Sequence, residues 1–213
     1  MKRVLVIATR NRAKFTELAA LLRMPGVTLR SLRAFPHAPR VIEDGRTFEA
    51  NARKKALAIA RATGQVAIGD DSGLMVEALR GAPGVWSARF AGPSATDAEN
   101  NTTLLRLLRG VPRHRRRAAF HCTLAIADPN GWVRVVEGRC EGRIADAPRG
   151  RHGFGYDPLF IIPRYGRTFG ELGRRYKSRL SHRARAARRA RVIVAAYFRS
   201  PAVHPARVHR GTV

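Results

Sequence analysis

The chain has 213 residues, of which 45% are hydrophobic, 41 are basic and 15 are acidic, and this is enough apolar material for one domain or for one domain with two lobes. No apolar run approaches the ~18 residues that a membrane-spanning helix needs, and the stretch from Val4 to Ala8 is shorter than the hydrophobic region of a signal peptide, so we expect a cytoplasmic protein. The two cysteines, Cys122 and Cys140, lie in no CxxC pair, which excludes a disulfide framework and argues against a zinc or redox centre.

Apolar patterns in the first part of the chain alternate between strand and helix. The expected elements are a strand at 4–8, a helix after Asn11, a strand at 28–32, a helix at 48–62 that Gly64 ends, and a strand at 66–68. Asp70 and Asp71 follow the last of these. We therefore expect both carboxylates at the C-terminal end of a strand, where ligands bind in α/β sheets.

The second part predicts a helix, a hairpin, a short strand and a final helix. The helix spans 96–108, is capped by Thr96 or Asp97, and turns Leu104, Leu105, Leu107 and Leu108 inward. The hairpin strands lie at 118–127 and 132–139, joined by the turn 128–131; the short strand lies at 159–162 and the last helix at 180–198.

This order of elements predicts the fold class and the domain organisation. We expect an α/β fold with a mixed twisted sheet, flanked by helices and carrying a smaller antiparallel lobe. Residues 1–198 are expected to form one domain. Residues 199–213 contain two prolines and no periodicity, so we expect a disordered basic tail.

Arginine dominates the basic residues, because only five of the 41 are lysine: Lys2, Lys14, Lys54, Lys55 and Lys177. This excess indicates a global composition bias, so nucleic acid is not the expected functional partner. The last 50 residues, with 14 basic residues and one acidic residue, keep an Arg-rich nucleic-acid-binding protein as an alternative. In such a chain, lysine is expected where a compact ammonium fits and a planar guanidinium does not.

Two segments in the first part carry candidate chemistry. In the run Gly69-Asp70-Asp71-Ser72-Gly73, paired carboxylates can hold a divalent cation and accept a proton from water; a turn with a helix-capping Asp is the equal alternative. The run from Thr9 to Lys14 opens a helix, where free backbone N–H groups favour phosphate. The alternative there is that Asn11 is an ordinary N-cap.

Two further segments lie in the second part. The loop from Gly153 to Pro158 can lay an aromatic ring against a nucleobase, or it can be a turn anchored in the core. Lys177, followed by Ser181, His182 and Arg183, enters the predicted last helix near its N-terminus, where the helix dipole disfavours cations. An external anion or a solvated face would explain this placement.

Eight motifs, taken together, carry a resemblance. ATRNRAKFTEL, FEANARKKALAIA, AIGDDSGL, GAPGVWSARFAG, ATDAEN, FHCTLAIA, GFGYDP and KSRLSHR resemble, in order and spacing, the inosine triphosphate pyrophosphatase family, from about Val4 to Phe198. These enzymes remove non-canonical purine triphosphates from the nucleotide pool. The resemblance implies an ITPase-like fold and hydrolysis of inosine, deoxyinosine or xanthosine triphosphate to the monophosphate and pyrophosphate. A pyrophosphatase for other modified nucleotides is the nearest alternative.

The resemblance also implies roles for individual residues. Asp71 would be the proton acceptor and a ligand of Mg²⁺, with Glu43 assisting the metal, and Ser72 would touch the substrate. The triphosphate would be bound by Thr9, Arg10, Asn11, Arg12, Ala13, Lys14 and Lys55; the base pocket and its phosphate edge would be formed by Phe154, Gly155, Tyr156, Asp157, Lys177, His182 and Arg183. The family is typically a homodimer with a cleft between two lobes.

Some positions depart from the family pattern. Gly69 stands where alanine is usual, His152 and Ala184 stand where glycine is common, and Arg174-Arg175-Tyr176 replaces a more acidic run. None of the proposed catalytic groups is missing. The choice between Asp70 and Asp71 as the base stays open at this point.

Overall fold

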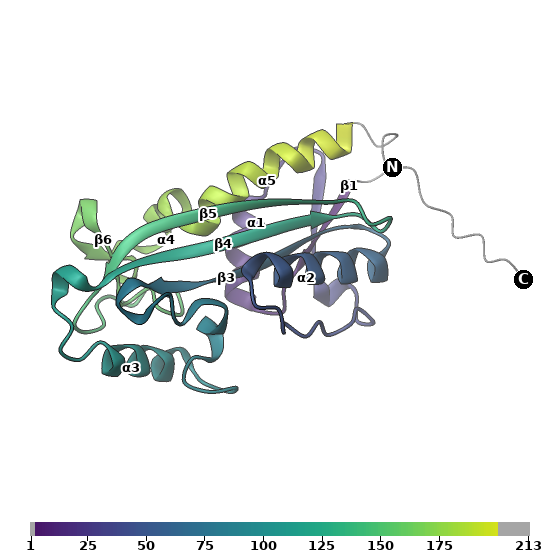
Figure 1. Cartoon of the computed structure of the whole chain (residues 1–213). Helices are drawn as coiled ribbons and strands as arrows, with labels where there is room; N and C mark the ends of the chain where they lie inside the picture. Colours follow the sequence, from purple (N-terminus) through teal and green to yellow (C-terminus); the bar gives the residue numbers. More distant parts are fainter. Residues whose placement is uncertain (1–2, 200–213) are drawn as a thin grey trace, which may run out of the picture.

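A mixed sheet forms the centre of the protein (Figure 1). The structure is a computed structural model that describes residues 3–199. The strands are β1 (Arg3–Ala8), β2 (Val27–Ser31), β3 (Val66–Val76), β4 (Arg117–Ala127), β5 (Val133–Ile144), β6 (Phe160–Ile162) and β7 (Arg167–Thr168). Their order across the sheet is β2-β1-β3-β4-β5-β6-β7. Strands β2, β1 and β3 are parallel, and each neighbouring pair from β3 to β7 is antiparallel, which confirms the predicted mixed sheet.

Helices cover both faces of this sheet. They are α1 (Arg12–Leu21), α2 (Phe48–Thr63), α3 (Asp97–Leu107), α4 (Phe169–Leu180) and α5 (His182–Arg199). Short 3-10 helices lie at η1 (Leu32–Ala34), η2 (Glu77–Leu79), η3 (Gly84–Arg89), η4 (Arg113–Arg115) and η5 (Pro163–Tyr165). Figure 1 shows α2 and α5 on opposite sides of the long strands β3, β4 and β5.

The alternation of side chains along the strands produces two separate cores in the larger lobe. Leu5, Ile7 and Ile68 face α1 and α5 and pack with residues of both helices. Val6 and Ala67 face the other way and pack against α2. Because α2 contributes mainly alanines to this contact, its backbone lies close to the sheet.

A third core defines the smaller lobe at the far end of β3, β4 and β5. Here Leu74 and Phe120 pack with Leu104 of α3, Phe160 of β6 and Phe169 of α4. The pairs in this part of the sheet are antiparallel, as expected for the smaller lobe. The functional residues considered below lie between this lobe and the larger one.

Several local expectations were wrong. Strand β3 continues to Val76 instead of ending near Ile68, because β4 pairs with it up to Val76, so the two acids lie within the strand. Leu107 is 43% exposed, because α3 buries only one stripe of side chains, which includes Leu104. Helix α4 was not expected.

Helix α4 also changes the interpretation of Lys177. This lysine lies in the last turn of α4, where the helix dipole favours a cation, and not at the start of the final helix. Helix α5 begins at His182 and ends at Arg199. The rest of the predicted tail, 200–213, lies outside the described residues. Within residues 3–199, no helix has the length and apolar character of a membrane span.

Candidate active site

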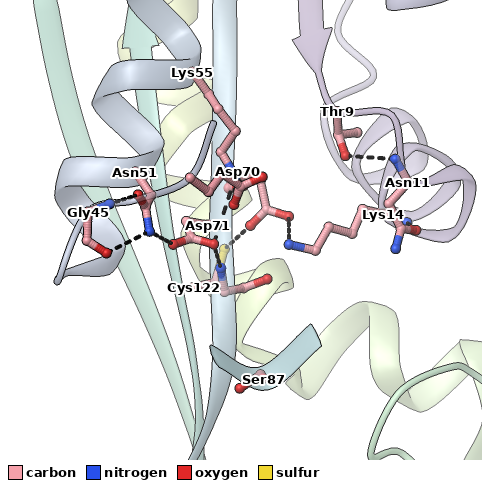
Figure 2. Close-up of polar contacts among 12 residues, drawn as sticks. Thr9, Asn11, Lys14, Gly45, Asn51, Lys55, Asp70, Asp71, Ser87 and Cys122 are labelled. Atoms are coloured by element: carbon pink, nitrogen blue, oxygen red, sulfur yellow. Dashed lines mark hydrogen bonds and ion pairs between the residues drawn. The ribbon is translucent and has the colours of Figure 1, made fainter. Parts of the chain in front are cut away.

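Asp70 and Asp71 lie at the point where β3 loses its parallel neighbour. The pairing of β1 with β3 ends at Ala8 and Gly69, whereas β4 continues alongside both acids. Successive side chains of a strand point to opposite faces, and Figure 2 shows Asp70 directed toward α1 and Asp71 toward α2. The adjacent carboxylates therefore have different surroundings.

Asp70 is enclosed by cations. It is 1% exposed; its Oδ2 lies 3.5 Å from Nζ of Lys14 and 3.3 Å from Nε of Arg183, and its Oδ1 lies 3.4 Å from Sγ of Cys122. Burial alone raises the pKa of Asp70, but the charges of Lys14, Arg183 and Lys55 outweigh burial and hold the pKa well below its usual range. Asp70 is thus a permanent anion that fixes two cations.

Asp71 is less tightly held. Its Oδ2 accepts a hydrogen bond from Nδ2 of Asn51 at 3.0 Å, and its Oδ1 lies 3.8 Å from Nζ of Lys55. Burial is the largest influence and raises the pKa of Asp71, against the lowering effects of Lys55, Lys14 and the Asn51 hydrogen bond. A carboxylate with a raised pKa is the better proton acceptor of the two.

Lys55 joins Asp71 to Glu43. Its Nζ lies 2.7 Å from Oε2 of Glu43 and also donates to the backbone carbonyl of Asp70 (Figure 2). The ammonium therefore occupies the space between the carboxylates of Glu43 and Asp71. The backbone of Glu43 is held as well, because its carbonyl accepts a hydrogen bond from Nη2 of Arg89 at 2.9 Å.

The close approach of α2 explains Gly69. A Cβ at this position would lie 2.4 Å from the carbonyl oxygen of Ala52 and 2.8 Å from the amide nitrogen of Ala56. Because both contacts are with helix backbone, an alanine here would push α2 away from β3. The glycine thus keeps Asn51 and Lys55 within reach of Asp71.

The N-terminus of α1 lies on the Asp70 side of β3. Asn11 is the N-cap, and its Oδ1 accepts from the backbone N–H of Lys14 at 3.0 Å; Thr9 Oγ1 accepts from the N–H of Asn11 at 3.2 Å. The ordinary N-cap interpretation of Asn11 is therefore confirmed. Arg10 points elsewhere, since its Nη2 donates to the carbonyl of Ala38.

A cavity of about 100 Å³ opens beside these residues, between the two lobes. Its lining includes Asn11, Lys14, Ser72, Phe154, Asp157, Lys177, His182 and Arg183. Arg12 and Ala13 do not reach it; they line a neighbouring hollow of about 480 Å³ between α1 and α4. The cavity thus brings together all the residues expected at the base site, but of those expected to bind the triphosphate only Asn11 and Lys14 line it.

Lys177 lines this cavity, is buried and is paired with two acids. Its Nζ forms ion pairs with Asp157 and, at 2.7 Å, with Oε1 of Glu17, and it lies 4.3 Å from the ring centroid of Phe154. Asp157 also accepts the N–H of Phe154 at 2.9 Å. The lysine therefore fixes the loop that carries the aromatic ring.

Arg183 is 2% exposed and all three of its nitrogen atoms have partners. Nη1 donates to Glu17 at 2.6 Å, Nη2 to Oγ of Ser72 at 2.7 Å, and Nε to Asp70. His182 stacks on Phe120 with ring centroids 4.7 Å apart. Burial, followed by the charges of Arg183 and Lys177, lowers the pKa of His182 well below its usual value, so the imidazole is neutral.

Two of the loop residues have structural contacts. Tyr156 is 4% exposed, packs in the core of the smaller lobe, and donates from its hydroxyl to the carbonyl of Ser87 at 2.9 Å. Gly155 is held by side chains of α3 through both its N–H and its carbonyl. The contacts of Tyr156 are therefore those of a turn anchored in the core.

The carboxylates of Glu43 and Asp71 are the candidate ligands for a divalent metal. Within residues 3–199 there is no cluster of three or more His, Cys, Asp or Glu side chains that would enclose an ion. Glu43 and Asp71 provide two carboxylates, and Lys55 already places a positive charge between them. Mg²⁺ is commonly bound by one or two carboxylates with water and substrate phosphates completing the shell, so these residues fit Mg²⁺ together with a phosphate ligand.

Two contributing residues were missed from the sequence. Glu17 binds both Lys177 and Arg183, and Asn51 binds Asp71. Asn51 precedes Lys55 by four residues in α2, and Glu17 follows Lys14 by three in α1. Both spacings place the pairs on one helix face, which was the signal available.

Comparisons with known proteins identify the family of the chain. The signature of the Ham1 family matches residues 5–192. A dITP/XTP pyrophosphatase of Desulforamulus reducens is 52% identical over 190 residues, covering 89% of this chain and 94% of its own; one of Geobacillus kaustophilus is 52% identical, covering 85% and 89%.

Solved structures are similar in fold. A HAM1 protein from Coxiella burnetii is similar with a TM-score of 0.83 and 39% identity, covering 91% of this chain and 99% of its own. A dITP/XTP pyrophosphatase from Mycobacterium abscessus has a TM-score of 0.70 and 40% identity, covering 91% and 97%. The resemblance drawn from the eight motifs is confirmed, and the chain belongs to the Ham1 family.

Proposed function

We propose that this protein is a Mg²⁺-dependent nucleoside triphosphate pyrophosphatase that converts inosine, deoxyinosine and xanthosine triphosphates to the monophosphate and pyrophosphate. Two relatives of about the same length, each 52% identical, are dITP/XTP pyrophosphatases. Family membership supports the reaction class. The arrangement of charges supports the assignment of residues to it.

The observation that carries this assignment is the placement of three lysines. Lys14, Lys55 and Lys177 each lie within 4 Å of a carboxylate at or beside the cleft, whereas Lys54 is exposed and pairs with exposed Asp44. In a chain whose other cations are almost all arginine, these compact ammonium groups provide point charges for phosphate oxygens.

The chemical step assigned here is in-line attack of water on the α-phosphorus. Asp71 accepts the proton of the attacking water, because its pKa is raised by burial. Lys14 and Lys55 bind phosphate oxygens and stabilise the charge that develops on the leaving pyrophosphate. Asp70 holds Lys14 and Arg183 in place and takes no proton, because its pKa is held low.

Glu43 and Asp71 are the residues that would hold Mg²⁺. When bound, the ion supplies charge neutralisation at the phosphates. In the presence of triphosphate, Lys55 would exchange its contact with Glu43 for a phosphate oxygen, which would free the Glu43 carboxylate to help hold the ion. On the other side of the cavity, Phe154 offers a ring to the base, and neutral His182 has Nδ1 buried with no hydrogen-bond partner among residues 3–199.

A panel assay tests this function. Pyrophosphate release is measured with inosine, xanthosine, adenosine, guanosine and a modified pyrimidine triphosphate, each with and without Mg²⁺. Turnover of the first two that requires Mg²⁺ supports the proposal, and preference for a modified pyrimidine would favour the alternative substrate class. We also propose a cytoplasmic homodimer, which light scattering on the purified chain and cell fractionation test.

A further inference from the structure

Helix α3 holds the loop from Gly153 to Pro158 by two hydrogen bonds, one that it accepts from Gly155 and one that it donates to Gly155. Oδ2 of Asp97 accepts the N–H of Gly155 at 2.6 Å, and Nδ2 of Asn101 donates to the carbonyl oxygen of Gly155 at 3.0 Å. Asp97 and Asn101 are four residues apart, which places both on one face of the helix. These two residues belong to a motif region, beginning ATDAEN, to which the proposed reaction assigns no role.

The two contacts fix the backbone on both sides of Gly155. Its N–H belongs to the peptide group shared with Phe154, and its carbonyl belongs to the peptide group shared with Tyr156. Gly155 has φ of 60°, a left-handed conformation that glycine adopts without strain. With both neighbouring peptide planes held, the direction in which Phe154 leaves the backbone is set by α3.

The helix itself is a firm support. Thr96 and Glu99 form a reciprocal cap at its N-terminus, and Leu104 is fully buried in the core of the smaller lobe. Asn100 ties the helix to the segment after η3, because its Oδ1 accepts the N–H of Ala91 at 2.9 Å. A displacement of α3 would therefore break several contacts.

The loop held in this way faces the cleft. Phe154 lies over Lys177 and lines the cavity of about 100 Å³, and Asp97 and Gly155 line the same cavity. On the far side, Phe154 is tied through its N–H to Asp157. The ring is thus positioned from two directions, by Asp157 and Lys177 on one side and by α3 on the other.

We infer that Asp97 and Asn101 are positioning residues for purine recognition, and that they act through Gly155 on the orientation of Phe154. This inference rests on the proposed function. It places the discrimination of the base partly in α3, through the loop that carries Phe154. Because Asp71 lies on β3 and Lys55 on α2, loosening the contacts of Asp97 and Asn101 with Gly155 raises KM and leaves kcat nearly unchanged.

The directions of the hydrogen bonds give a sharp test. Asn101→Asp keeps the size of the side chain but turns an acceptor oxygen toward the carbonyl oxygen of Gly155. The hydrogen bond is lost and the two oxygens repel each other, so we expect the KM for inosine triphosphate to rise about tenfold. Asp97→Asn retains an oxygen that can accept the N–H of Gly155, so its KM stays within about threefold of wild type. Thr102→Ala, an exposed site on the same helix, is the control.

Two readouts separate positioning from general damage. Inhibition by inorganic tripolyphosphate reports the phosphate site alone, and its inhibition constant stays unchanged in Asn101→Asp. The ratio of specificity constants for inosine and adenosine triphosphate falls in the same variant. Equal losses for tripolyphosphate and inosine triphosphate, or unchanged KM and selectivity, would overturn the inference.

The comparison of Asp97→Ala with Asp97→Asn keeps the test informative if Asn101→Asp does not fold. Asp97 is exposed, so both variants are expected to fold, and only the alanine variant loses the contact with Gly155. Equal KM values for these two variants would contradict the inference that the contact between Asp97 and Gly155 orients Phe154. If the wild-type chain does not hydrolyse inosine triphosphate, the proposed function itself is refuted. This result is distinguishable, because the wild type is assayed before any variant is compared with it.

Discussion

Asp70 and Asp71 are neighbours in the chain, yet their side chains lie on opposite faces of β3 and meet different partners. Asp70 contacts Lys14 and Arg183, and Asp71 contacts Asn51 and Lys55. The cations around Asp70 outweigh its burial and hold its pKa low, whereas burial outweighs Lys55 and the Asn51 hydrogen bond and raises the pKa of Asp71. One residue is therefore suited to hold cations and the other to accept a proton.

This difference predicts opposite phenotypes for two isosteric variants. Asp71→Asn keeps or increases the free energy of unfolding, because it removes an unfavourably buried charge, and it lowers kcat ~10²–10⁴-fold, as expected for loss of a general base. Asp70→Asn leaves Arg183 with one carboxylate fewer in a buried site and lowers the free energy of unfolding by about 3 kcal/mol. Chemical denaturation and steady-state kinetics on both variants check this. Half of wild-type turnover in Asp71→Asn would remove Asp71 from the mechanism.

Lys177→Arg should be damaging although both side chains are cationic. The ammonium lies between Glu17 and Asp157 against the ring of Phe154, and a larger, planar and forked guanidinium does not reproduce the contacts of a compact point charge. We expect KM for inosine triphosphate to rise about tenfold or more. Lys54→Arg is the matched control, because Lys54 is exposed. Equal KM values for the two variants would show that the site does not require the compact ammonium of a lysine at position 177.

Asn51→Ala tests the connection between α2 and Asp71. The carboxamide donates to Asp71 and exchanges two hydrogen bonds with the backbone of Gly45, two residues after Glu43 (Figure 2). Its removal leaves Asp71 and the segment around Glu43 less well fixed, and we expect kcat to fall about tenfold or more. Asn130→Ala, in the exposed hairpin turn, serves for comparison. A kcat equal to that of the wild type would make Asn51 only a structural residue.

The buried neutral imidazole of His182 predicts how stability depends on pH. Its pKa is lowered in the folded protein, so the unfolded chain takes up a proton below about pH 6.5 that the folded chain does not. The contribution of the neutral imidazole to the free energy of unfolding is complete above that pH. It is lost as the pH falls toward the folded pKa, and the free energy of unfolding then decreases by up to about 1.4 kcal/mol per pH unit. Urea unfolding between pH 5 and 8 should show this slope in the wild type and a smaller slope in His182→Gln. Identical slopes would mean that the imidazole is not buried as described.

Substrate selectivity follows from the hydrogen-bonding capacity of the pocket. Purine position six carries an acceptor oxygen in hypoxanthine and xanthine but an amino donor in adenine. Arg183 can only donate, and a neutral imidazole such as His182 has one donor nitrogen. The other nitrogen of a neutral imidazole accepts and can face the amino group, so only the donor–donor mismatch with Arg183, at roughly 1–3 kcal/mol, is counted; it predicts about 10–10²-fold lower kcat/KM for adenosine than for inosine triphosphate. A measured ratio within tenfold of unity would contradict the assignment of the pocket.

The sequence alone determined the elements whose signals are local. The buried strand before Thr9, the N-cap at Asn11, the end of α2 at Gly64 and the turn after Asp128 were all predicted and are present. Each depends on a few neighbouring residues and on backbone preferences that act within one turn of chain. The eight motifs also determined the family, because their order and spacing are properties of the chain itself.

Tertiary structure decided the rest. Strand β3 passes through the two acids because β4 pairs with it beyond the end of β1, and a partner 50 residues away leaves no local signal. The different tasks of Asp70 and Asp71 follow from the helices that cover each face, and Glu17 joins the site only because α1 meets α4 and α5. Long-range packing, and the burial that shifts each pKa, exist only in the folded chain.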